Sequence, residues 1–170
     1  MRIIEAMRKI KANTERCTSL NDLIAQYCAD YDVQTPTYPD QTAQVTAWLT
    51  AVHDLLAEIE TLKFKIAKTN VMTPVTIEIG GNHITKSIYQ WIQRRSDLAK
   101  CEALSWSRLG DRGLKANQLT NTADGKTVLV QVRRYFDPQL KDSKIALFQA
   151  EPHLIDGALE ITNATTDLVD

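Results

Sequence analysis

The side chains most often used for metal binding and nucleophilic catalysis are few in this sequence and lie far apart. The three histidines fit no metal-ligand spacing such as His-Glu-x-x-His; they are His53, His83 and His153. The three cysteines form no Cys-x-x-Cys pair, and none has the neighbouring sequence of a known nucleophile; they are Cys17, Cys28 and Cys101. We therefore expect no catalytic or metal-binding residues and a protein that is not an enzyme.

Gly80-Gly81 lies between a predicted strand and a predicted helix, where nucleotide-binding proteins place their phosphate loops. The residues around it contain neither Gly-x-Gly-x-x-Gly nor the Gly-Lys-Ser/Thr of nucleotide sites. Two adjacent glycines are sufficient for a tight turn. We therefore discard nucleotide binding and expect no cofactor.

Arginines cluster in the second half of the chain. They are Arg94, Arg95, Arg108, Arg112, Arg133 and Arg134. The last two lie in a predicted strand, so their side chains should face opposite ways, and one can reach a carboxylate such as Asp97, Asp111 or Asp137. The chain has 20 basic and 21 acidic side chains, without the basic excess of nucleic-acid-binding proteins. Internal ion pairs or a subunit interface are therefore favoured over a nucleic-acid patch.

Large aromatic residues near these arginines are candidate interface anchors, because aromatic and arginine side chains often carry binding energy. Trp48 fits a helical seam and is predicted to be core, and burial in the monomer is also the simpler expectation for Trp91. The candidate interface residues are Trp91, Trp106, Arg95, Arg133, Arg134 and Tyr135.

The elements that position these residues are predicted to be mainly helical. A length of 170 residues suits one domain, and 6 Gly and 5 Pro are few for a turn-rich all-β fold. Helices are expected at about 2–29, 41–69, 85–109 and 138–162, and strands at about 75–79 and 116–134. We expect a single domain, residues 1–170, in which long antiparallel helical hairpins form a bundle with a small β-hairpin or sheet element.

The predicted second helix carries the most regular apolar pattern, which fills the a and d positions of a heptad without a gap. These positions are Val45, Trp48, Val52, Leu55, Ile59, Leu62, Ile66 and Thr69. In the first helix one set recurs every seven residues and a second set fills the alternate seam. The sets are Ile3, Ile10, Cys17 and Ile24, and Met7, Thr14, Asn21 and Cys28. The patterns predict close packing of the second helix against another long helix, and burial of Cys17 and Cys28.

The helix ends carry local signals of their own. Asp137-Pro138 is expected to open the last helix, and Pro152 to kink it or split it in two. Thr69-Asn70 and Thr162-Asn163 share their spacing to a following Thr, so each predicts a similar left-handed helix cap. This match is either an approximate internal repeat or a coincidence between two helix ends. Residues 165–170 are expected to fray.

The sequence also bears on location. No apolar run approaches the roughly 18 residues of a membrane span, and Met1–Lys9 lacks the continuous apolar core of a secretory signal. An odd number of cysteines without close pairing favours a reducing compartment. We expect a virion or bacterial cytoplasmic location, no secretion by a signal peptide, and neither a membrane nor a nucleic acid as partner.

Several segments together resemble a family of small helical proteins of bacteria and their phages, some members of which are labelled septicolysin-like. The resemblance covers most of the chain in outline. The segments are Ile66-Ala67-Lys68-Thr69-Asn70, Ile84-Thr85 before a helix with Arg94-Arg95 and Asp97-Leu98, Val132-Arg133-Arg134-Tyr135, and Thr162-Asn163-Ala164-Thr165-Thr166-Asp167-Leu168. The resemblance implies long antiparallel helices with a small β element. The label implies cytolytic activity, but we find no long amphipathic segment with a bulky apolar face to enter a bilayer.

These observations favour a non-enzymatic structural or assembly protein, such as a component of a phage particle (head, neck or tail). Its expected partners are further copies of itself or other structural proteins of the same assembly. A membrane-active, toxin-like protein is one alternative. The other is a small ligand-binding protein or enzyme whose site is assembled from His83, Arg95, Arg134 and nearby acids.

Overall fold

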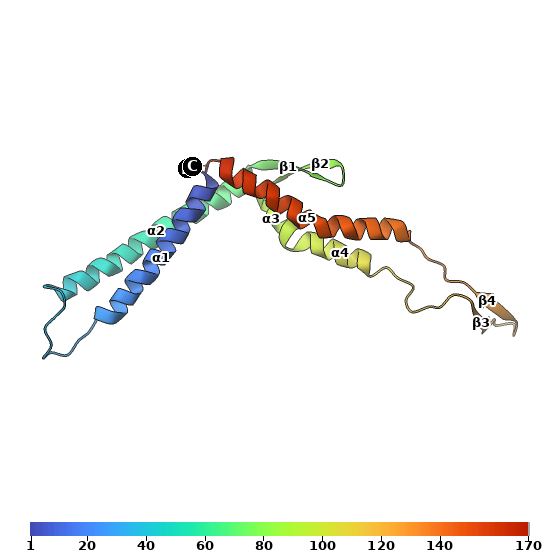
Figure 1. The fold of residues 1–170 in the computed structure, drawn as a ribbon, viewed down its shortest axis with the longest axis horizontal. Helices are drawn as coiled ribbons and strands as arrows, with labels where there is room; N and C mark the ends of the chain where they lie inside the picture. Colours follow the sequence, from blue (N-terminus) through green and yellow to red (C-terminus); the bar gives the residue numbers. More distant parts are fainter. Residues whose placement is uncertain (170) are drawn as a thin grey trace. The chain divides into compact units, whose positions relative to one another are not determined.

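The computed structural model describes residues 1–169 and is mainly helical, with two small antiparallel sheets of two strands each (Figure 1). Its contacts divide the chain into two compact units. The first contains Met1–Pro74, Ser87–Tyr89 and the segment that begins at Leu159, and the second contains Val75–Lys86 and Gln90–Ala158. The single domain expected from the chain length stays a prediction.

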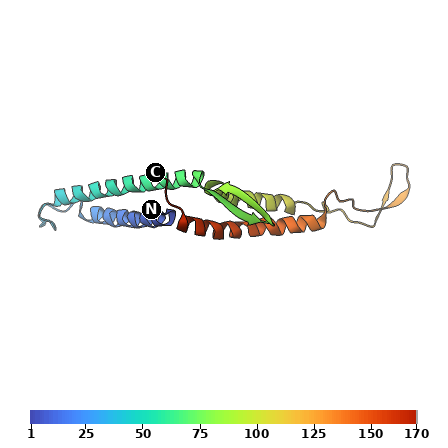
Figure 2. The same cartoon turned by 90° about the horizontal axis from the view of Figure 1, so that it is seen from above.

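The first unit is built on an antiparallel helical hairpin of α1 (Ile3–Tyr27) and α2 (Gln41–Met72), which run side by side in Figures 1 and 2. Asp40 begins α2 as an N-cap, because its Oδ1 accepts a hydrogen bond from the Ala43 N–H at 2.8 Å. The predicted seam of α2 is confirmed, since all eight of its residues are buried or half-buried. Packing against α1 thus follows the heptad pattern of the sequence.

The buried face of α1 differs from the predicted one. Ala6 and Asn13 are buried, whereas Met7, in the predicted seam, is exposed. Cys28 is also exposed, because α1 ends at Tyr27. The true seam lies one position before the predicted second set, so the heptad phase of that set and the burial of Cys28 were wrong.

An aromatic cluster closes the loop end of the hairpin. The rings of Tyr27, Tyr38 and Trp48 contact one another with centroids 5.4 to 6.0 Å apart. Gln41 Nε2 donates to the Tyr27 carbonyl at 2.8 Å and ties the two helix ends together. Trp48 is buried, as predicted.

At the other end of this unit the two chain termini pair with each other. The Ile3 N–H donates to the Thr166 carbonyl at 3.0 Å, and the Leu168 N–H donates to the Met1 carbonyl at 2.8 Å. Residues 166–169 are therefore held rather than frayed, contrary to the prediction; residue 170 lies outside the described residues.

The predicted left-handed caps are wrong. Both Thr-Asn pairs lie inside their helices, because α2 continues to Met72 and α5 (Pro138–Thr165) continues to Thr165. Thr69 is fully buried, and its Oγ1 accepts a hydrogen bond from the Val169 N–H at 2.9 Å. Its hydroxyl thus serves the pairing of the C-terminal segment rather than a cap.

The second unit contains the hairpin of β1 (Pro74–Ile79) and β2 (Asn82–Ser87) except for its end residues Pro74 and Ser87. Gly80 and Gly81 form its turn with φ of +58° and +77°, which only glycine adopts readily. The predicted first strand and turn are confirmed. The predicted helix start at about residue 85 is wrong, because the chain remains a strand to Ser87.

A helical run follows from Ile88 to Ser107. It consists of α3 (Ile88–Gln93), a π-helical turn η1 (Arg94–Leu98) and α4 (Ala99–Ser107). Most of α5, up to Ala158, also belongs to this unit. At its start the Gln139 N–H donates to the Asp137 carboxylate, as expected for Asp137-Pro138. Pro152 lies within α5 without splitting it, so of the two predicted outcomes, a kink or a split, the split does not occur.

Residues 108–137, which we call the arm, connect α4 to α5 and carry the second hairpin, β3 (Gln118–Asn121) and β4 (Thr127–Val130). Leu119 pairs with Leu129 in its register. Figures 1 and 2 show this hairpin beyond the ends of α4 and α5. The predicted hairpin is confirmed, but its second strand ends before Arg133 and Arg134. Among residues 1–169 no helix combines the length and apolar character needed to cross a bilayer.

Candidate functional site

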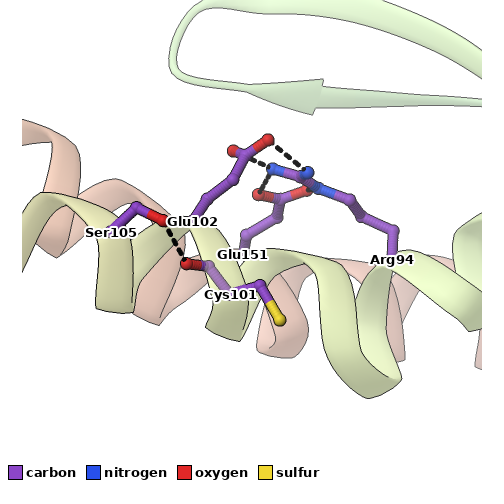
Figure 3. A network of polar contacts seen from close by, with 5 residues as sticks. All are labelled: Arg94, Cys101, Glu102, Ser105 and Glu151. Carbon is purple, nitrogen blue, oxygen red and sulfur yellow. Dashed lines mark hydrogen bonds and ion pairs between the residues drawn. The ribbon is translucent and has the colours of Figure 1, made fainter.

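Arg94, the first residue of the π-helical turn, binds two carboxylates at once (Figure 3). Its Nε and Nη2 donate to Glu151 at 2.5 and 2.9 Å, and its Nη1 and Nη2 donate to Glu102 at 2.9 and 2.7 Å. The guanidinium also lies 5.5 Å from the ring centroid of Phe148. These contacts tie the start of η1 to both α4 and α5.

The electrostatics of this network favour the charged forms of Arg94 and Glu102. Hydrogen bonds to Glu102 and Glu151 raise the pKa of Arg94 above its ordinary value, against the opposing effect of burial. The hydrogen bonds from Arg94 lower the pKa of Glu102. The four bonds use most of the five N–H groups of the guanidinium. Little donor capacity is left for a substrate, and we interpret the network as a structural brace.

Two side chains with potentially nucleophilic atoms, Ser105 and Cys101, lie near this brace (Figure 3). The Ser105 hydroxyl donates to the Cys101 carbonyl at 3.0 Å, within its own helix (Figure 3). Cys101 is a free, exposed cysteine on the same helix. A nucleophile needs a hydrogen-bonded base, and neither side chain has one among its described contacts.

Arg95 follows Arg94 in the π-helical turn and also reaches α5. Its Nη1 donates to Asp156 at 2.8 Å; Arg95 is half-buried and Asp156 is exposed. Two consecutive arginines therefore contact the same helix. π turns are frequent at functional sites, but here both side chains are engaged in internal ion pairs.

The histidines do not converge. His53, His83 and His153 are exposed on α2, β2 and α5 respectively. Within residues 1–169 no group of three or more His, Cys, Asp and Glu side chains is arranged to hold a metal ion. Among the sequence candidates for a ligand site, Arg95 and Arg134 pair with different carboxylates, Asp156 and Asp111.

An ion pair joins the two ends of the arm, the segment that follows α4 and the segment that precedes α5. Arg134 Nε and Nη2 donate to the Asp111 carboxylate at 2.6 and 2.7 Å. These bonds lower the pKa of Asp111 and raise the pKa of Arg134. Asp111 was one of three carboxylates predicted to meet this arginine pair, and this contact is confirmed. The predicted reason is wrong, because Arg133 and Arg134 lie outside the strand.

A shallow, open hollow of about 300 Å³ lies beside this ion pair. Its lining residues combine arginine with apolar side chains; they are Arg108, Leu109, Gly110, Asp111, Arg112, Leu114, Val132, Arg133, Arg134, Tyr135 and Phe136. The arm contains six Lys or Arg and three Asp, so its net charge is +3. The balanced charge of the whole chain conceals this local basic surface.

The β3–β4 hairpin is unusually open. Every residue of both strands is exposed except Val130, which is half-buried. Leu119 and Leu129 are 72% and 56% exposed and lie opposite each other on one face. Cross-strand hydrogen bonds flank this pair on the same face, from Thr127 to Asn121 at 2.9 Å and from Gln131 to Asn117 at 2.6 Å.

The predicted interface residues thus divide into three kinds. Trp91 is fully buried and donates from Nε1 to the Val75 carbonyl at 2.9 Å, so it is a core residue and unavailable as an interface anchor. Trp106 is half-buried, and Arg95 is paired with Asp156. Arg133, Arg134 and Tyr135 all line the hollow of the arm.

Sequence reasoning missed the exposed leucines of the hairpin and the buried carboxylate of Glu151. Leu119 lies between two polar residues and Leu129 between two valines, and neither pattern gave any sign that both leucines would be exposed. Glu151 lies 57 residues from Arg94. No spacing rule joins residues so far apart.

Comparisons with known proteins bear on the fold alone. No family model and no curated protein matches the chain. A solved structure, the "crystal structure of a functionally unknown conserved protein from Corynebacterium diphtheriae", is similar with a TM-score of 0.56 and 19% sequence identity. The match covers 99% of this chain and 99% of that chain.

Proposed function

We propose that this chain is a non-enzymatic structural protein that works within an assembly, such as the head, neck or tail of a phage particle. Its partners are further copies of itself or other structural proteins, and its location is the virion or the bacterial cytoplasm. The long helical hairpins pack as a bundle within that assembly. The observation that carries this proposal is the apolar hairpin of the arm.

A two-stranded hairpin is marginally stable in water unless a hydrophobic face packs on something else. In β3–β4 the described chain covers only Val130, and only in part, and the opposite face presents the exposed Leu119–Leu129 pair. Such a surface on an extended edge is a site for association with another chain. A partner that covers this face gains apolar burial without any rearrangement of the helices.

The two other functions that the sequence left open have less support. A ligand site from His83, Arg95 and Arg134 would need free cations, but both arginines are engaged by carboxylates. A membrane-active role rests on the family label alone. It predicts release of dye from liposomes by the purified chain, which we do not expect at any lipid composition.

The first test is the mass of the purified protein by size-exclusion chromatography with light scattering, over a wide range of concentration. We expect a defined oligomer that weakens in the L119T/L129T variant, where threonine keeps the β propensity of the strands. The control is L49Q/L56Q, because Leu49 and Leu56 are 54% and 53% exposed on α2. A monomer at every concentration, or equal loss in both variants, would refute the proposal.

A further inference from the structure

We propose that the hollow of the arm receives the acidic loop of a second copy of this chain, so that copies join head to tail. This inference rests on the proposed assembly function and names the contact through which copies associate. It follows from charges, exposed apolar side chains and backbone geometry at two places on the chain.

The acceptor surface is the hollow of the arm. Arg134 is neutralised by Asp111. Within residues 1–169 no carboxylate forms an ion pair with the three other arginines of the hollow, Arg108, Arg112 and Arg133. Unpaired cations beside apolar side chains form a surface for an acidic segment that also carries apolar groups.

The backbone of the hollow has an uncommon conformation. Arg112 has a φ of +55°, in the left-handed region that non-glycine residues seldom adopt, and Gly113 follows with +75°. Residues held in this region persist where the surrounding structure requires them, often at binding sites. Here the conformation places Arg112 in the lining of the hollow.

The matching segment is the loop between α1 and α2, residues 28–40. It contains three Asp and no Lys, Arg or His, which gives a charge of −3 against +3 for the arm. Asp30-Tyr31-Asp32-Val33 alternates acidic with apolar residues, and Tyr31 and Val33 are both strongly exposed. The loop therefore offers charge and apolar surface together, as the hollow does.

This loop is also pre-formed. The Gln34 N–H donates to the Tyr31 carbonyl at 2.8 Å, and the Gln34 side chain accepts from the Tyr31 N–H at 3.2 Å. Both bonds fix the turn that presents Asp32 and Val33. Less conformational entropy is then lost on binding than with a disordered segment.

The geometry of such a contact has a consequence for assembly. The loop and the hollow are different surfaces, so their contact is heterologous, and a copy that binds through its loop has its own hollow for a further contact. Copies then add in one direction until a ring closes or a filament grows.

The test uses two full-length variants that each lose one side of the contact. D30N/D32N removes the loop charges, and R112Q/R133Q removes two cations of the hollow. Each alone should associate about tenfold more weakly than the parent, because two exposed ion pairs contribute together on the order of one decade. Added salt should weaken the parent in the same way. Circular dichroism is the check that both variants are folded.

A one-to-one mixture of the two variants gives the sharpest readout. The intact loop of one should bind the intact hollow of the other and stop there, which gives a heterodimer of defined mass in light scattering. Controls with the same charge changes at exposed helical positions, D54N/E60Q on α2 and R8Q/R16Q on α1, should assemble like the parent.

Each other outcome is decisive. If the parent assembles and both the loop variant and the arm variant assemble as well as the parent, this contact is wrong but the assembly function stands. A parent that is monomeric at every concentration overturns both. If only the arm variant loses association, and a labelled oligonucleotide binds the arm of the parent, the basic surface belongs to nucleic acid and the contact is overturned.

Discussion

Replacing Glu151 with glutamine keeps the size of the side chain but removes the negative charge closest to Arg94. Glu151 is 3% exposed and Arg94 17%, so water cannot replace the lost interaction. The new amide also turns an NH2 group, a donor, towards the donors of the guanidinium. We expect E151Q to be one of the most damaging single charge changes in the second unit.

The magnitude follows from burial. Removing one partner of a buried ion pair costs about 3–5 kcal/mol, and the remaining carboxylate of Glu102 moderates the loss to about 3 kcal/mol. E102Q should cost about 1 kcal/mol or less, because Glu102 is 46% exposed and water screens its interaction. At this chain length 3 kcal/mol corresponds to a decrease of about 6–12 °C in Tm.

Urea unfolding at neutral pH, followed by circular dichroism, gives the free energy of unfolding of each variant. The matched control is E160Q, the same change at an exposed position of the same helix. If E151Q and E160Q lie within about 0.5 kcal/mol of each other, the network does not brace the helices and the reasoning fails. A larger loss for E102Q than for E151Q would equally refute it.

Three further changes have defined outcomes. N13L should stabilise the first unit by about 1 kcal/mol in urea unfolding, because leucine buries more apolar area at this buried seam position. Asn13 now donates a hydrogen bond to Glu58, and a loss of stability would show that this bond outweighs the added burial. T69V should cost about 1–2 kcal/mol, because Val169 N–H loses its acceptor, and it should speed hydrogen exchange at that amide. The hydrogen bond from Arg94 lowers the pKa of Glu102, so its stabilising contribution is present above the unfolded value of about 4.3 and is lost as pH falls. The urea midpoint of E102Q should therefore change less than that of the parent on acidification, and an equal change would contradict this assignment.

The α2 seam was predictable because the evidence for it is local. Eight apolar or small residues keep a strict heptad spacing over the whole helix, and all eight are buried or half-buried in the structure. The α1 seam was not, because Asn13 occupies a buried position and Met7 an exposed one. Asn13 tolerates burial through its bond to Glu58 on α2, which only the folded pairing supplies.

Tertiary contacts also override the local rules for Pro152 and the π-helical turn. Proline in a helix interior removes a backbone hydrogen bond and normally breaks the helix. Here α5 continues through Pro152, and Glu151 before it and Ile155 one turn later are both buried. Likewise the π turn begins at Arg94, whose partner Glu151 belongs to a distant part of the sequence. Helix propensity is a property of the local sequence and therefore could not predict either feature.

The arm marks the limit of sequence reasoning in a different way. The turn signal at residues 123–126 and the β-rich run that follows it correctly predicted a hairpin. The usual assumption is that the apolar face of such a hairpin packs on the core of the same chain. In the structure that face remains exposed at Leu119 and Leu129. A sequence pattern predicts that a face is buried, but not whether the residues that bury it belong to the same chain. The uncovered face is therefore itself evidence on function, and it is the reason to look for the partner of this protein at the arm.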